Sequence, residues 1–122
     1  MLSRWLFSLA RSPWWGNWAG FLFTYMSFIL PVQYLYKGET VLAFHHPRPA
    51  YPFHVLLVSK QPRRNLMALS PQDSLFLHEL MEAVQKLVQE FHLEEKGYRL
   101  ICNGGPYQDI PHLHFHLITD QT

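Results

Sequence analysis

The sequence contains a single cysteine, and this scarcity excludes two kinds of small domain. Cys102 has no second cysteine with which to form an intramolecular disulfide, and no zinc site built on paired cysteines can exist. Cys102 falls in a stretch that reads as a β-strand, so we interpret it as a buried free thiol.

The chain also has little net charge and no glycine-rich phosphate loop. Its formal net charge is +1 over 122 residues, which is too small to indicate a nucleic-acid surface. Neither GxGxxG nor GK[ST] occurs, and there is no repeat or low-complexity tract. A hydrophobic content of 48% with 16% aromatic residues is typical of one folded domain with a real core, and it excludes a disordered chain.

No apolar run is long enough and uninterrupted enough to span a bilayer. The 25 residues between Arg11 and Lys37 carry no charge, but prolines and glycines divide them, and the least interrupted run, 21–30, has only ten residues. The apolar stretch after Arg4 is too short for a secretory signal. We therefore expect an aromatic-rich helical segment at residues 1–30, followed by a domain at 31–122. The aromatic segment can pack on its own domain, on a second subunit, or, through residues 1–20, on a membrane surface.

Histidine is abundant where other reactive residues are scarce. Six of the eight histidines form two clusters, one at His45, His46 and His54 and the other at His112, His114 and His116. The second cluster lies in the stretch HLHFHLI, whose alternation predicts a β-strand. The apolar members, Leu113, Phe115 and Leu117, should then face the core, and the histidines should share the opposite face.

The remaining pattern predicts an α+β domain with one helix and about five strands. Ser70, Pro71 and Asp73 form a helix start, and apolar residues follow at helical spacing to about His92. The predicted strands are residues 32–36, 40–44, 53–59, 98–103 and 112–118. Short connections between them favour an antiparallel sheet, with the long helix covering one face.

Three interpretations of the histidine strand are open. A metal could bind two of its imidazoles with His54 or His46, although ligands in a row on one strand diverge. The histidines could simply cover a solvated sheet face. Phosphate chemistry is favoured, because a neutral imidazole can attack phosphorus while a neighbouring imidazolium neutralises the oxygens. The backbone of Gly104 and Gly105 could hold the phosphate, with Asn103 and Gln108 orienting the leaving group or water, and no metal or cofactor is required.

Here the chain resembles the histidine triad (HIT) superfamily of nucleotide hydrolases and transferases. HLHFHLI matches its signature His-φ-His-φ-His-φ-φ, and VLAFHHPRPAYPFHVLLVSK and GYRLICNGG resemble its upstream segments in the same order. The resemblance covers about residues 31–118. It implies an antiparallel β-meander fold, frequent two-fold dimers, and attack at the α-phosphate of purine nucleotides or their conjugates.

The resemblance also implies roles for individual residues. His114 would be the nucleophile, His116 and His54 would contact the phosphate, and His112 would orient and polarise His114. Further nucleotide contacts are implied for Asn103, Gln108 and Phe44, and less directly for Leu22 or Tyr25.

Two residues depart from the family pattern. His46 stands where an acid usually binds the ribose hydroxyls, and Asp109 stands where a serine or threonine commonly meets the phosphate or leaving group. The expectation is a cytoplasmic HIT-like nucleotide phosphohydrolase or nucleotidyltransferase that forms a covalent nucleotidyl-histidine and assembles as a homodimer. The alternative is a nucleotide-binding or membrane-associated module with little or no turnover.

We expect a variant lacking residues 1–18 to remain folded and catalytically competent, because every triad segment lies further along the chain. Its oligomeric state or its liposome binding should change, since the deleted aromatic surface would cover a second subunit or rest on lipid. Light scattering after size exclusion and liposome flotation, applied to both chains, measure this. An unfolded variant would show that the deleted segment is part of the core, and identical behaviour in both assays would exclude both roles.

Overall fold

The computed structural model describes residues 33–122. The expectations for the aromatic segment, including Leu22 and Tyr25 as pocket residues, lie outside the described residues. Within the described part, no helix has both the length and the apolar composition to cross a bilayer.

Five antiparallel strands form one sheet, which confirms the predicted fold class. The strands are β1 (Tyr34–Lys37), β2 (Val41–His45), β3 (Phe53–Ser59), β4 (Arg99–Ile101) and β5 (His114–Thr119). Their order across the sheet is β1-β2-β3-β5-β4. The last strand therefore lies between β3 and β4, and the order departs from a simple meander at this point. Since β3 and β4 both run antiparallel to β5, they run parallel to each other, and a helical crossover joins them.

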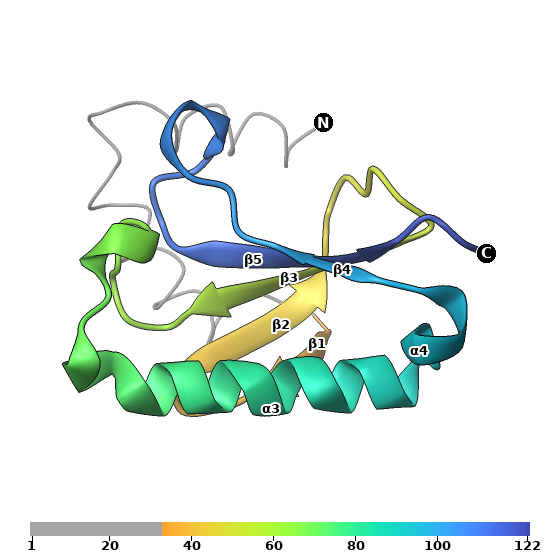
Figure 1. Ribbon diagram of the computed structural model, residues 1–122, viewed down its shortest axis with the longest axis horizontal. Coiled ribbons are helices and arrows are strands. Elements are labelled where there is room, and N and C mark those ends of the chain that lie inside the picture. The colour runs from red at the N-terminus through yellow and green to blue at the C-terminus, as the bar shows by residue number, and fades with distance from the viewer. Residues whose placement is uncertain (1–32) are drawn as a thin grey trace.

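That crossover is helix α3 (Ser74–Glu90), which lies along one face of the sheet (Figure 1). The predicted helix start is present, but its first turn is the 3₁₀ helix η3 (Pro71–Asp73), capped by Ser70. His92 follows α3 with a φ of 55°, and α4 (Leu93–Lys96) ends at Gly97, whose φ of 86° suits glycine. Two further 3₁₀ turns, η2 (Leu66–Ala68) and η4 (Gly105–Tyr107), lie in the connections.

The core lies between α3 and the sheet. Leu113, Phe115 and Leu117 are buried there as predicted, against helix residues such as Leu80 and Leu87. The alternate side chains of each strand point to the opposite face of the sheet. The loops at residues 46–52 and 102–113 both rise on that side, away from α3 (Figure 1). His54, His114 and His116 lie on that opposite face, whereas His45 lies on the core side, where its ring contacts Phe53 and Phe91.

Candidate active site

The chain enters the site through His112, which precedes β5 instead of belonging to it. The sequence pattern predicted a strand from residue 112, but β5 begins at His114. The His112 N–H donates to the Ile110 carbonyl (2.8 Å), and the His112 Nε2–H donates to the Ser59 carbonyl (2.6 Å). These bonds turn the chain, so the 1%-exposed ring of His112 lies at the end of β3 and not in a row with its neighbours.

One hydrogen bond defines the protonation state of His114. Its Nδ1 lies 2.7 Å from the backbone carbonyl oxygen of His112. A carbonyl oxygen can only accept, so Nδ1 carries the proton, and in the neutral ring Nε2 keeps its lone pair. His112 thus contacts His114 through its backbone carbonyl.

Backbone groups impose the opposite tautomer on the other rings. The Ala50 N–H donates to Nδ1 of His54 (3.1 Å), so the neutral His54 ring carries its proton on Nε2. That nitrogen lies 2.9 Å from Nδ1 of His116, to which it donates, and His116 in turn keeps its proton on Nε2. Both nitrogens of His54 are thereby engaged in hydrogen bonds, and His54 orients the His116 ring.

His46 extends the site beyond the triad. The Arg48 N–H donates to Nδ1 of His46 (2.9 Å), which places the proton of the neutral ring on Nε2. We call His46, His54, His116 and His114 the histidine row. Successive ring centroids along it are 4.3, 5.1 and 5.1 Å apart. Within this row His114 is distinguished by an unprotonated Nε2.

The row is held in its neutral form at neutral pH. The pKa is lowered from 6.5 to about 4 for His46, His112 and His116, and it is lowered as well for His54 and His114. Burial is the largest cause for each ring, and for His46 and His116 the charge of neighbouring imidazoles adds to it. A neutral imidazole is the nucleophilic form, so His114 is suited to attack.

An apolar cluster adjoins the row on the same face. Leu42, Leu56 and Val58 are buried there, with Tyr34 and Phe44 packed against them. Phe44 pairs across the sheet with Leu56, and Leu56 pairs with His116, so a direct line of residues connects Phe44 to the row. Phe44 contacts Tyr34 edge to face, with ring centroids 6.2 Å apart.

The loop before β5 borders a cavity of about 360 Å³. It is lined by Arg64, Asn65, Gly105, Gln108, Asp109 and Pro111. The Gln108 amide donates to the carbonyls of Arg64 (2.8 Å) and Ile110 (2.9 Å), so it closes the loop. Asn103 is half-buried beyond the end of β4, near the same loop.

Asp109 connects this cavity to the histidine row. Its exposed carboxylate lies close enough to His46 and His114 to raise the pKa of both rings, although burial, which lowers their pKa, is the stronger influence. The structure thus brings together two residues that depart from the expected pattern, His46 and Asp109, around His114.

Comparison with known proteins identifies the family. A sequence model of the HIT domain matches residues 29–122. The chain belongs to the HIT family. It is 34% identical over 91 residues to an uncharacterized HIT-like protein of Synechococcus elongatus, covering 73% of this chain and 79% of that protein. A similar relative from Buchnera aphidicola is 32% identical over 92 residues, which cover 74% of this chain and 82% of the relative.

Solved HIT structures share the fold. A HIT family hydrolase from Legionella pneumophila superposes with a TM-score of 0.74 at 27% identity, covering 83% of this chain and 92% of that one. A HIT family hydrolase from Clostridium thermocellum gives a TM-score of 0.72 at 32% identity, covering 81% and 88%. Both comparisons confirm the resemblance drawn from the triad and its upstream segments.

The parts of this HIT site that the sequence did not reveal are mostly backbone groups. The carbonyls of Ser59 and His112 and the N–H groups of Arg48 and Ala50 determine the tautomers, and no residue type signals them. The apolar cluster could have been found, because Leu42, Leu56 and Val58 occupy alternate strand positions. Among residues 33–122, no three His, Cys, Asp or Glu side chains are arranged to hold a metal ion.

We expect the domain to lose stability as the pH falls from about 6.5 towards about 4. Below 6.5 the unfolded chain takes up protons on these histidines, whereas the folded protein resists until the lowered pKa, so acid favours unfolding. Urea unfolding at about pH 7 and about pH 5 avoids most carboxylate titration. His46→Gln should weaken the dependence, and His78→Gln, on the exposed side of α3, should not. An equal midpoint at both pH values would contradict the account.

Proposed function

We propose that this HIT protein is a nucleotide phosphohydrolase or nucleotidyltransferase that acts at an α-phosphate through a nucleotidyl-histidine on His114. The observation that carries the proposal is the tautomer pattern of the histidine row. Within this row, only His114 has a backbone carbonyl that holds the proton on Nδ1 and leaves Nε2 for attack, while His116 keeps an Nε2–H that can donate to phosphate oxygens.

The proposed reaction proceeds in two displacements. Nε2 of His114 attacks the α-phosphorus and forms an N–P bond, while the bond to the leaving group breaks and that group departs with the electron pair and takes up a proton. Water, or an acceptor hydroxyl, then attacks phosphorus, loses its proton, and displaces the imidazole. Binding of the anionic phosphate raises the affinity of the adjacent rings for protons, so His116 can become the imidazolium that neutralises the developing charge.

The nucleoside would occupy the side of the row that leads to Phe44. A buried apolar cluster next to a polar row suits a purine base joined to a phosphate. A further solved relative, from Candida albicans, is described as a histidine triad nucleotide-binding protein, with 25% identity and a TM-score of 0.70. Together with the Legionella hydrolase, it supports both nucleotide binding and hydrolysis for this chain.

The homodimer also stays a proposal. Its support is the family resemblance together with the position of β4 at one edge of the sheet, where a second subunit could approach.

We predict that His114→Ala lowers kcat by about a thousandfold or more while nucleotide affinity changes by less than about threefold. The nucleophile stabilises the transition state far more than the bound ground state. Release from an adenosine phosphoramidate and nucleotide titration measure the two effects, with exposed His78→Ala as the control. Near wild-type turnover in His114→Ala would refute the mechanism. Binding without turnover in the wild type would instead favour the binding module.

We predict that substrates with an amine leaving group are preferred over dinucleoside polyphosphates, because the Asp109 carboxylate repels additional phosphate charge and attracts an amine. Asp109→Ser should therefore raise kcat/KM for the polyphosphate relative to the phosphoramidate. Parallel assays of both substrates on both proteins test this. If the wild type uses them equally and Asp109→Ser changes neither, Asp109 has no part in selection.

A further inference from the structure

The residues that hold His112 belong to one short segment after β3. Ser59 accepts the Nε2–H of His112 through its carbonyl, at 2.6 Å. Four residues later, the Arg63 carbonyl accepts the Leu113 N–H at 2.8 Å. The peptide between His112 and Leu113 supplies the carbonyl that fixes His114. Residues 59–63 therefore hold this peptide through one hydrogen bond to His112 and one to Leu113.

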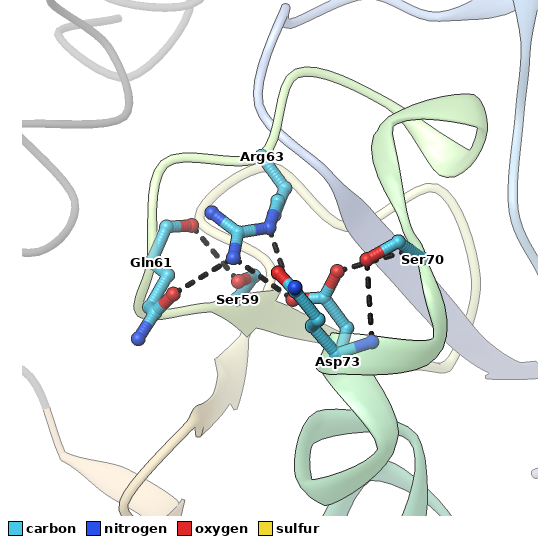
Figure 2. A network of polar contacts seen from close by, with 6 residues as sticks. Ser59, Gln61, Arg63, Ser70 and Asp73 are labelled. Atoms are coloured by element: carbon cyan, nitrogen blue, oxygen red, sulfur yellow. Dashed lines mark hydrogen bonds and ion pairs between the residues drawn. The ribbon is translucent and has the colours of Figure 1, made fainter.

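This segment has its own internal bonds. The Ser59 hydroxyl donates to the Gln61 carbonyl (2.9 Å), and the Arg63 N–H donates to the same carbonyl (2.8 Å). The Arg63 guanidinium donates to the side-chain oxygen of Gln61 (3.0 Å). Figure 2 shows how these three residues close into a compact turn beside the start of α3.

Asp73 anchors the segment to helix α3. Its Oδ1 accepts from Nε of Arg63 at 3.0 Å and lies 2.9 Å from the second guanidinium nitrogen, and its Oδ2 accepts the Ser70 N–H at 3.0 Å (Figure 2). The Asp73 side chain is 9% exposed and the Arg63 side chain 29% exposed, so the carboxylate is the more shielded partner of the pair. The hydrogen bond from Arg63, followed by that from Ser70, lowers the pKa of the Asp73 carboxyl and keeps it ionised.

We propose that the Arg63–Asp73 ion pair is a positioning element for His114: it holds residues 59–63 in place, and they hold the His112 carbonyl against Nδ1 of His114. The consequence for turnover rests on the proposed function, whereas the consequence for the ring does not. The bond from His114 to the carbonyl is 2.7 Å long, and such bonds weaken steeply with misalignment. If the carbonyl moves, the proton of His114 is no longer confined to Nδ1, and a fraction of the rings loses the nucleophilic Nε2.

Helix α3 carries another carboxylate, the half-buried Glu79, that provides a control. Glu79 accepts hydrogen bonds from the Thr40 N–H (2.7 Å), the Thr40 hydroxyl (2.6 Å) and the Glu39 N–H (3.2 Å), all in the turn between β1 and β2. Glu79→Gln thus removes a carboxylate charge from α3, which directly follows the 3₁₀ turn that carries Asp73. It leaves the Arg63–Asp73 pair unchanged, so it reports general loosening of the fold.

The test measures the ring nitrogens of His114 by ¹⁵N NMR in the wild type and in Asp73→Asn, Arg63→Lys and Glu79→Gln. The wild type and Glu79→Gln should show one tautomer with the proton on Nδ1. Asp73→Asn and Arg63→Lys should show a shift towards a mixture of tautomers. In a phosphoramidase assay the same two variants should lose about tenfold in kcat with KM within about twofold.

Arg63→Lys keeps the positive charge and is the milder change. If Asp73→Asn does not fold, Arg63→Lys therefore tests the positioning role of the ion pair. Wild-type nitrogen shifts in a folded Arg63→Lys, or equal changes in Glu79→Gln, would overturn the positioning role. If the wild type turned over no nucleotide, the proposed function would fail, yet the nitrogen shifts would still test the ion pair.

Discussion

The site depends on the hydrogen bond between Nδ1 of His114 and the carbonyl of His112. Two neutral tautomers of an imidazole differ only in which nitrogen holds the proton, and the free ring has access to both. A backbone carbonyl at 2.7 Å removes this freedom, because it offers no hydrogen to donate. The bonds of His112 to Ser59 and Ile110 help to keep that carbonyl in place.

In the other rings of the row, hydrogen bonds fix the opposite tautomer, with the proton on Nε2. The backbone N–H groups of Arg48 and Ala50 donate to Nδ1 of His46 and His54, respectively. The Nε2–H of His54 then donates to Nδ1 of His116. An imidazole with an unprotonated Nε2 therefore lies beside imidazoles that carry a proton on Nε2, although the side chains are chemically identical. Backbone N–H groups of the loop at residues 46–52 donate to His46 and His54, whereas the backbone carbonyl of His112 accepts from His114, so the fold, and not the residue types, determines the tautomers.

This arrangement has a thermodynamic consequence. Buried imidazoles with lowered pKa values keep the site neutral in the absence of substrate. Because the unfolded chain binds protons more readily than these buried rings, the folded state becomes less stable in acid. An anionic ligand raises the pKa of the imidazoles that it contacts, because its negative charge favours their protonated form. Binding of phosphate and uptake of protons are thus coupled in this account, and the coupling supplies positive charge only when the substrate is present.

Much of the fold followed from periodicity. The alternation around Phe115 predicted β5 and its buried face, and the capping residues Ser70 and Asp73 predicted the start of the long helix. The insertion of β5 between β3 and β4 could not be predicted, because strand order depends on tertiary pairing. The turn at His112 was missed for a related reason: its alternating pattern continues that of β5, but bonds to Ser59 and Ile110 remove it from the strand.

Within the site, the sequence identified the rings but not their protonation. The histidines of both clusters were recognised from spacing and family resemblance, and four of them form the row. Their tautomers depend on backbone donors and acceptors at positions 48, 50, 59 and 112, where the identity of the side chain carries no information. The ion pair between Arg63 and Asp73 was also hidden, because ten residues and a 3₁₀ turn separate its members.

The most direct test of the central claim is a crystal structure of the protein with a bound purine mononucleotide. The account predicts that the α-phosphorus lies within reach of Nε2 of His114, in line for attack, while Nδ1 stays bonded to the His112 carbonyl and the base extends towards Phe44. A phosphate bound away from the row, or a His114 ring turned so that Nδ1 faces phosphorus, would contradict it.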